Sequence, residues 1–214
     1  MLTDLLESDV SNLPIFREMC QDSFEFVSYN DVQFKNILIS QLISELEAED
    51  MGIYLGSPKK EAREIDRFSQ SRHQFLGKAD NPISVLKDVQ YIDLTSFDSK
   101  GILKRLERHI EGESIDWLIL DLTLDQLSPS LIDLLNEFYE EYAVTVVVAY
   151  YLPDDPKVVN FFKRRTDLSF NSPELNTKKP SSGKVATLSS IHSDREMKTF
   201  INVRPHYGVL QEEI

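Results

Sequence analysis

The chain alternates between short runs of hydrophobic residues and longer segments in which hydrophobic residues recur at helical spacing. Short runs rich in β-branched and aromatic residues predict strands at residues 24–29, 52–55, 89–94, 116–121 and 144–151. Helical spacing predicts helices at residues 32–46, 99–110 and 129–142, and residues 59–82 predict a polar helix followed by a loop. Because strands alternate with helices, the pattern predicts an α/β domain with a mostly parallel central sheet.

The residues at the ends of these segments support the same interpretation. Ser96 or Asp98 can cap the helix that follows the third strand, and Ser128-Pro129 places a cap and an N1 proline before the next helix. The run at 116–121 is almost entirely apolar, which is typical of a strand covered on both faces in a parallel sheet.

The hydrophobic pattern changes in the last third of the chain. Residues 171–183 are rich in Ser, Pro and Lys and predict a loop. Residues 185–190 and 198–203 flank the polar segment 192–195 and predict an antiparallel hairpin, with a third short strand at 207–210.

Length and charge limit the possible functions. A chain of 214 residues fits one domain, and 36 acidic against 23 basic residues give a net charge of −13. This charge argues against broad electrostatic binding to nucleic acid or an anionic membrane, but a local basic patch remains compatible with it. The single Cys20 excludes an internal disulfide framework and is expected to be a buried apolar residue. The acidic N-terminus and the short apolar runs indicate a soluble intracellular protein.

The strand at 116–121 ends in Asp121 and resembles the Walker B element of P-loop ATPases, whose acid holds Mg²⁺ through water. A structural role, capping the turn that follows, is the alternative for Asp121. The glycine-rich Walker A loop, G-x-x-x-x-G-K-[S/T], should follow the first strand, but residues 30–36 contain no glycine. Asp31 would also repel a phosphate near the start of the helix. We therefore expect no autonomous ATP hydrolysis and no cofactor.

Other catalytic arrangements are absent from the sequence. The four histidines, at positions 73, 109, 192 and 206, lie in separate predicted elements with no ligand spacing between them. No G-x-S-x-G nucleophile motif occurs. The sequence therefore predicts no catalytic residue and no metal ligand.

One basic segment can carry a binding function. Lys163, Arg164 and Arg165 follow two phenylalanines, and Lys178 and Lys179 lie in the loop beyond them. One interpretation is an exposed amphipathic turn whose charge is balanced by nearby aspartates. The other is a phosphate-contacting loop flanked by aromatic residues, and the sequence leaves both open.

The order of the elements resembles that of RecA-like (P-loop NTPase-like) domains: an early strand and helix, a mid-chain strand ending in Asp121, and a C-terminal hairpin. Within that group the chain resembles the fifth subunit of the eukaryotic Elongator complex over residues 14–27, 89–106, 117–151 and 187–203. The sister sixth subunit and the non-catalytic recombinase paralogues also lack a Walker A loop, so that trait does not separate them.

The resemblance implies a non-catalytic subunit of a hetero-hexameric ring, built from two copies of each of three RecA-like proteins. Its partners would be the two other RecA-like subunits, the catalytic Elongator subcomplex and, through the assembled ring, tRNA. The resemblance further implies that the ring binds tRNA and, with ATP, regulates its release, while another subunit modifies the wobble uridine. By position, Lys163, Arg164, Arg165, Lys178 and Lys179 can belong to a tRNA-contacting loop, and the family is cytoplasmic and nuclear.

The expected layout is a single RecA-like domain over residues 1–214. Its parts are an N-terminal helical extension (1–22), a parallel α/β core (23–152), a basic and Ser/Pro-rich loop region (153–183) and a C-terminal hairpin (184–214). A DNA-binding recombinase paralogue is the main alternative. An enzyme of Rossmann or flavodoxin architecture is a third, but no glycine-rich turn supports it.

Overall fold

The computed structural model describes residues 24–48, 51–75, 77, 84–87, 89–110, 115–142, 144–151, 168–171, 184–190 and 197–212. Several expectations fall on other parts of the chain. Outside the described residues lie the extension 1–22 with Cys20, the segment 192–195, and Lys163, Arg164, Arg165, Lys178 and Lys179.

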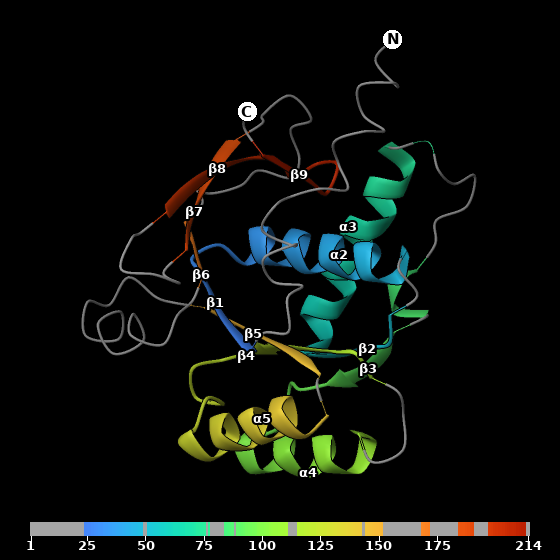
Figure 1. Cartoon of the computed structure of the whole chain (residues 1–214). Coiled ribbons are helices and arrows are strands. Elements are labelled where there is room, and N and C mark those ends of the chain that lie inside the picture. Colours follow the sequence, from blue (N-terminus) through green and yellow to red (C-terminus); the bar gives the residue numbers. More distant parts are fainter. Residues whose placement is uncertain are drawn as a thin grey trace.

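Within the described residues, a nine-stranded sheet forms the centre of the molecule (Figure 1). The strands are β1 (Phe24–Tyr29), β2 (Ile53–Ser57), β3 (Gln90–Asp93), β4 (Trp117–Leu122), β5 (Thr145–Tyr151), β6 (Leu168–Asn171), β7 (Lys184–Ser190), β8 (Met197–Arg204) and β9 (Val209–Glu212). The helices are α2 (Val32–Ala48), α3 (Lys59–Phe75), α4 (Ser99–Ile110), α5 (Pro129–Tyr142) and the short 3₁₀ helix η1 (Val85–Lys87). Their order confirms the predicted alternation of strands and helices.

The sheet has a parallel part and an antiparallel part, in the order β3-β2-β4-β5-β1-β6-β7-β8-β9. The strands from β3 to β6 in this order all pair in parallel, and β7 to β9 continue antiparallel. At the centre, Leu118 and Leu120 of β4 pair with Val146 and Val148 of β5. All four are fully buried, and each contributes about 1.5–3 kcal/mol by leaving water. The predicted parallel sheet and the predicted C-terminal hairpin are both present.

The expected loop region 153–183 is wrong in one respect, because it contains strand β6. This four-residue strand pairs in parallel with β1 and antiparallel with β7, so it joins the two parts of the sheet. Its sequence, Leu-Ser-Phe-Asn, is too short to give a clear alternation, and the Ser/Pro-rich stretch after it hides the pattern. The third C-terminal strand also begins later than expected, at Val209 rather than residue 207.

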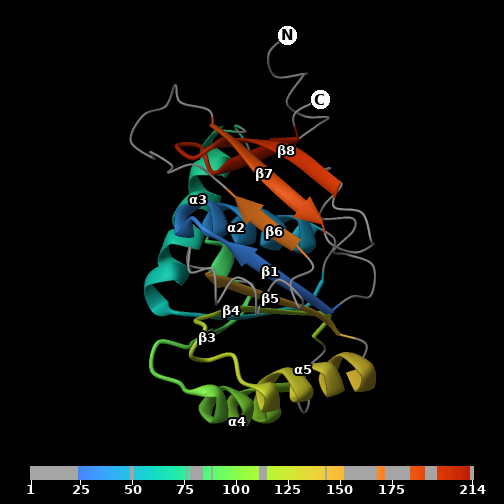
Figure 2. The ribbon, with the colours of Figure 1, turned by 90° about the vertical axis from the view of Figure 1, so that its left-hand side faces the viewer.

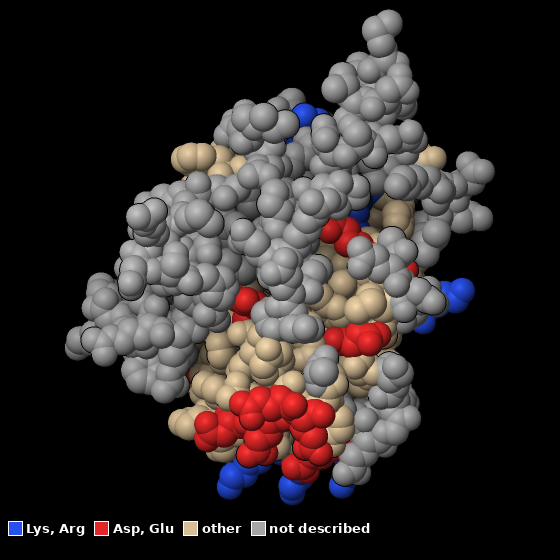
Figure 3. Space-filling view, in the orientation of Figure 1, with Lys and Arg blue, Asp and Glu red and all other residues tan. Residues whose placement is uncertain are grey.

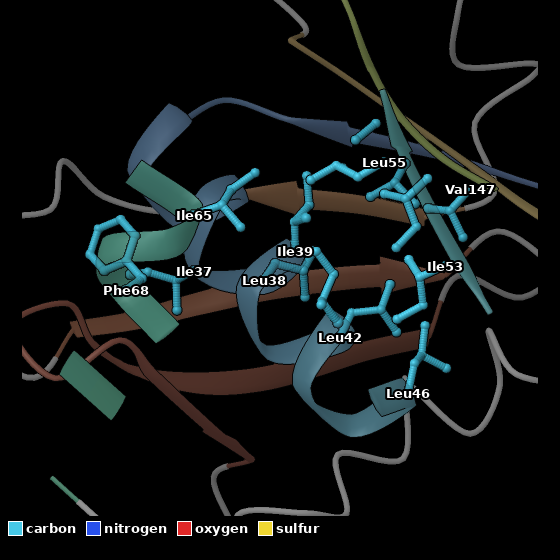
Figure 4. Packing of buried hydrophobic residues seen from close by; sticks show 14 of the residues in the cluster. Ile37, Leu38, Ile39, Leu42, Leu46, Ile53, Leu55, Ile65, Phe68 and Val147 are labelled. Carbon is cyan, nitrogen blue, oxygen red and sulfur yellow. The ribbon is translucent and has the colours of Figure 1, made fainter. Parts of the chain in front are cut away.

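Helices cover the two faces of the parallel part of the sheet (Figure 1). On one face, α4 and α5 bury Ile102, Leu106, Leu131 and Leu135 against β2, β4 and β5. On the other face, α2 and α3 pack together and form a second cluster with the sheet. Figure 4 shows Ile37, Leu38, Ile39, Leu42 and Leu46 of α2 facing Ile53, Leu55 and Val147 of the strands and Ile65 and Phe68 of α3.

The middle of helix α2 is buried on all sides. Every residue from 34 to 43 is buried, including the polar residues Lys35, Asn36, Ser40 and Gln41. The sheet lies on one side of α2, while α3 and β9 contact it on others, and the C-terminal strands lie over it (Figure 2). The C-terminal hairpin therefore completes the core instead of extending only the sheet edge.

Local hydrogen bonds explain where the helices begin. Asp98 is the cap of α4, since its Oδ1 accepts from the Gly101 N–H at 2.8 Å. Ser128 caps α5 as predicted, accepting from the Leu131 N–H at 3.2 Å. No helix among the described residues is long and apolar enough to cross a membrane.

Candidate functional site

Strands β1, β2, β4 and β5 are parallel, so their carboxyl ends meet at one edge of the sheet, and a cavity of about 400 Å³ opens there. In open α/β sheets, ligands bind at this edge. The cavity is lined by Tyr29, Val32, Lys35, Pro58, Glu61, Asp121, Leu122, Thr123, Leu124, Asp125 and Tyr151.

Asp121 lies near the end of β4, where the sequence places it, and its side chain is buried. Its Oδ1 accepts a hydrogen bond from the Tyr29 hydroxyl at 3.2 Å, and its Oδ2 accepts one from Ser57 Oγ at 3.1 Å. The same Oδ2 forms an ion pair with Lys35 Nζ. Asp121 does not cap the following turn, because Gln126 Oε1 accepts the Thr123 N–H at 2.9 Å instead.

Lys35 comes from the first turns of α2, directly after β1, and is only 1% exposed. Besides its ion pair with Asp121, its Nζ lies 3.6 Å from Glu61 Oε2 and 5.4 Å from the centroid of the Tyr29 ring. Burying a charge without a partner is costly, so each member of the Lys35–Asp121 pair depends on the other.

Glu61 supplies the second carboxylate beside Lys35. It lies in the first turn of α3, and its Oε2 also accepts a hydrogen bond from Asn36 Nδ2 at 2.7 Å. The start of α3 is fixed from the end of β3 and the turn after it, where Asp93 Oδ1 and Thr95 Oγ1 both accept the Lys59 N–H. Hydrogen bonds from Thr95, and then from Lys59, lower the pKa of Asp93. Five elements therefore meet at this cluster, namely β1, β2, β4, α2 and α3.

Tyr29 closes the cluster as a hydrogen-bond donor. Burial raises the pKa of its phenol far above the ordinary value of about 10, and the nearby Asp121 charge raises it further. The hydroxyl stays protonated and keeps its hydrogen available for the Asp121 carboxylate. An ionised phenolate would be repelled by this carboxylate.

The start of α2 differs from a phosphate-binding site. Only Asn30 and Asp31 connect β1 to α2. Asp31 Oδ1 accepts the Phe34 N–H at 2.8 Å, so this side chain caps the helix. Helix N-termini bind phosphate through free N–H groups and a positive dipole. Here a carboxylate occupies that position, as the sequence suggested for Asp31.

No protein-family model matches the sequence, and no curated protein matches it. The solved structures of similar fold include two at 11% sequence identity. A DnaB-like replicative helicase, described with its interactions with primase, aligns with a TM-score of 0.60 over 89% of this chain and 59% of that one. A second structure, described as an ATPase domain, aligns with a TM-score of 0.60 over 90% of this chain and 85% of that domain. The chain has a RecA-like fold.

This RecA-like domain spans less than two thirds of the helicase chain and most of the second structure's ATPase domain. The expectation of a RecA-like fold with a C-terminal antiparallel hairpin is confirmed. Asp121 lies, as expected, at the carboxyl end of a central strand.

The sequence located Asp121 but not its neighbours. It did not single out Lys35, Tyr29 and Ser57, which bind Asp121, or Glu61, which pairs with Lys35. A lone lysine among apolar residues looks like a surface position. One signal in the sequence could have pointed to this cluster. Lys35 is the only lysine of α2 and lies three residues after Val32, the first residue of that helix. A lysine this close to the first strand of an α/β sheet can reach the carboxyl edge.

The cluster does not have the composition of a metal centre. Among the described residues, no three His, Cys, Asp or Glu side chains gather in a group that could hold a metal ion. Of the four histidines, His206 is exposed and His73 is half-buried, and the side chains of the other two lie outside the described set. The cluster holds opposite charges against each other at the carboxyl edge of the sheet.

Proposed function

We propose that this chain is a non-catalytic structural subunit of the accessory ring of the Elongator complex. In this proposal it assembles with two other RecA-like subunits into a hetero-hexamer in the cytoplasm and nucleus. The ring holds tRNA for wobble-uridine modification by the catalytic Elongator subcomplex. The RecA-like fold and the resemblance over residues 14–27, 89–106 and 117–151 support the proposal.

The ion pair between Lys35 and Asp121 is the observation that carries the non-catalytic part of this proposal. A nucleotide site of this type needs an acid free to hold Mg²⁺ and a lysine free to contact phosphate. In this chain a buried lysine and the acid bind each other. A metal ion would have to displace the Lys35 ammonium group, and a phosphate would meet the Asp31 carboxylate at the helix start.

A domain that holds no nucleotide acts through the surfaces that it offers to neighbours. The basic residues Lys163, Arg164, Arg165, Lys178 and Lys179 stay our candidates for the tRNA contact, and they lie outside the described residues. The chain is strongly acidic, with a net charge of −13, so a tRNA contact needs such a local basic segment.

Co-expression with the other two RecA-like Elongator subunits tests the proposal. We expect the three proteins to co-purify as a hetero-hexamer that survives size-exclusion chromatography. A chain that stays outside the complex of the other two subunits would overturn the proposal.

Charge reversal tests the tRNA contact within the assembled ring. K163E/R164E/R165E should lower tRNA affinity at least about tenfold, because three phosphate contacts are lost and repulsion replaces them. The matched control K60E/R63E/R67E changes the same total charge on exposed positions of α3 and should leave affinity nearly unchanged. Unchanged binding by the first variant would remove these residues from the site.

Preference for single-stranded DNA over tRNA would favour a recombinase paralogue instead.

A further inference from the structure

The outer surface of α4 and α5 separates charges by sign. Helix α4 exposes Lys100, Lys104 and Arg108, which are spaced four residues apart and therefore lie on one side of the helix. Arg105 adds a fourth exposed basic residue, and Glu107 is the only acidic residue of α4. Helix α4 thus carries a basic stripe.

Helix α5 carries the opposite charge. Asp133, Glu137 and Glu141 have the same four-residue spacing, Glu140 adds a further acid, and all four are exposed. Helix α5 contains no Lys, Arg or His. Figure 3 shows acidic side chains gathered over α5, with Lys and Arg side chains along the margin beside it, where α4 lies in Figure 1. We refer to the basic stripe (Lys100, Lys104, Arg108) and the acidic stripe (Asp133, Glu137, Glu141).

The two stripes have the same length and lie side by side. Each spans nine residues of helix, or eight steps of about 1.5 Å, which corresponds to about 12 Å. The helices pack against each other on one face of the sheet. Both helices connect parallel strands, α4 between β3 and β4 and α5 between β4 and β5, so they run in the same direction.

These charges do not neutralise each other within the chain. Across the described residues, the six stripe residues make no ion pair or hydrogen bond between side chains, although their helices are neighbours. The inner faces of α4 and α5 are already committed to the core through Ile102, Leu106, Leu131 and Leu135. The charged outer face is therefore available to a partner.

We propose that this face binds a second copy of the chain, with the basic stripe of each copy on the acidic stripe of the other. A two-fold axis parallel to the helices exchanges the two stripes, so that every contact is made twice between opposite charges. A two-fold axis perpendicular to the helices would instead place like stripes together. The proposal stands on the stripes alone and does not depend on the ring proposed above.

Charge-reversal variants of the full chain test this arrangement by sedimentation velocity. At high micromolar concentration in about 50 mM NaCl, the wild type should show twice the chain mass of 24.7 kDa. In about 500 mM NaCl it should be a monomer, because salt screens exposed pairs. K100E/K104E/R108E and D133K/E137K/E141K should each be monomeric at low salt.

Mixing the two triple variants distinguishes loss of this interface from a general effect of net charge. An equimolar mixture of the two triple variants should form a heterodimer, and the chain carrying all six reversals should recover the homodimer. The control K60E/R63E/R67E changes the net charge by the same amount as the α4 variant and should remain dimeric. A monomeric wild type at low salt, dissociation of the control, or failure of the mixture to associate would each overturn the proposal.

Discussion

At the scale of single residues, the buried charges of Lys35 and Asp121 depend on each other. Replacing only one of them, in Lys35→Met or Asp121→Leu, leaves the other charge uncompensated in the core. Each single variant should lower the free energy of unfolding by about 3–5 kcal/mol in urea denaturation. The double variant should be clearly more stable than the sum of the two single changes predicts, because no unpaired charge remains.

An exposed ion pair provides the control for this cycle. Arg67 and Glu64 pair on the surface of α3, where their side chains are 49% and 37% exposed. Removing that pair should change the free energy of unfolding by at most about 1 kcal/mol. Additive losses at Lys35 and Asp121 would show that the two charges do not stabilise each other.

Because two tyrosines are buried, we expect the free energy of unfolding to fall in alkaline solution. Burial raises the pKa of Tyr54 to about 12 and raises that of Tyr29 as well. Above pH of about 10 the unfolded chain releases phenolic protons that the folded protein retains. The free energy of unfolding should therefore fall from about pH 10 upwards, with the Tyr54 contribution lost by about pH 12.

Urea denaturation of the wild type and of Tyr29→Phe/Tyr54→Phe across this pH range measures the effect. The double variant removes both groups and should show a shallower fall than the wild type. Identical pH profiles would contradict the assignment.

The position of a site residue was predictable where it lies next to a strong hydrophobic pattern. Asp121 ends an apolar run, so the sequence located it at the carboxyl edge of the sheet. Lys35 was not predictable, because its partners belong to β1, β4 and α3, and no local pattern encodes these distant contacts. Tyr29 and Ser57 were missed for a related reason, since their only relation to Asp121 is adjacency of strand ends in space.

At the scale of elements, the turn between β8 and β9 is fixed by Gly208. This glycine has a φ of +64°, and a Cβ there would lie 2.5 Å from the Phe68 carbonyl oxygen of α3. Gly77 has the same φ, but a Cβ at that position would meet nothing within 4 Å, so it isolates the effect of backbone conformation. Gly77→Ala should cost about 1 kcal/mol.

Gly208→Ala should cost at least about 1 kcal/mol more than Gly77→Ala, because the turn must also move away from α3. Urea denaturation of both variants gives the comparison. Equal losses would show that the contact between this turn and α3 does not constrain the C-terminal strands.

The order of elements was predictable because each helix and long strand carries its own hydrophobic period. Strand β6 was not, since four residues are too few to establish alternation and its pairing with β1 is a long-range contact. For the N-cap of α4 the sequence offered two residues, Ser96 and Asp98. The hydrogen bond from the Gly101 N–H identifies Asp98 as the cap. Hydrophobic periodicity thus located the elements, and local capping hydrogen bonds decided where α4 and α5 begin.

At the scale of the whole molecule, the chain has a RecA-like fold. At the edge where the carboxyl ends of its parallel strands meet, the buried charges of Lys35 and Asp121 form an ion pair. Helix α2 starts with a capping carboxylate, and its buried lysine holds the acid of β4. Under the proposed function, the surfaces of the domain, including the striped face of α4 and α5, are where the chain would act.

Calorimetric titration of the purified chain with Mg²⁺-ATP tests this account most directly. A RecA-like ATPase domain with an intact Walker A loop, titrated in the same buffer, serves as the positive control. Because Lys35 and Asp121 bind each other and Asp31 caps α2, we expect this chain to show no saturable heat of Mg²⁺-ATP binding. Saturable binding at micromolar Mg²⁺-ATP would contradict it.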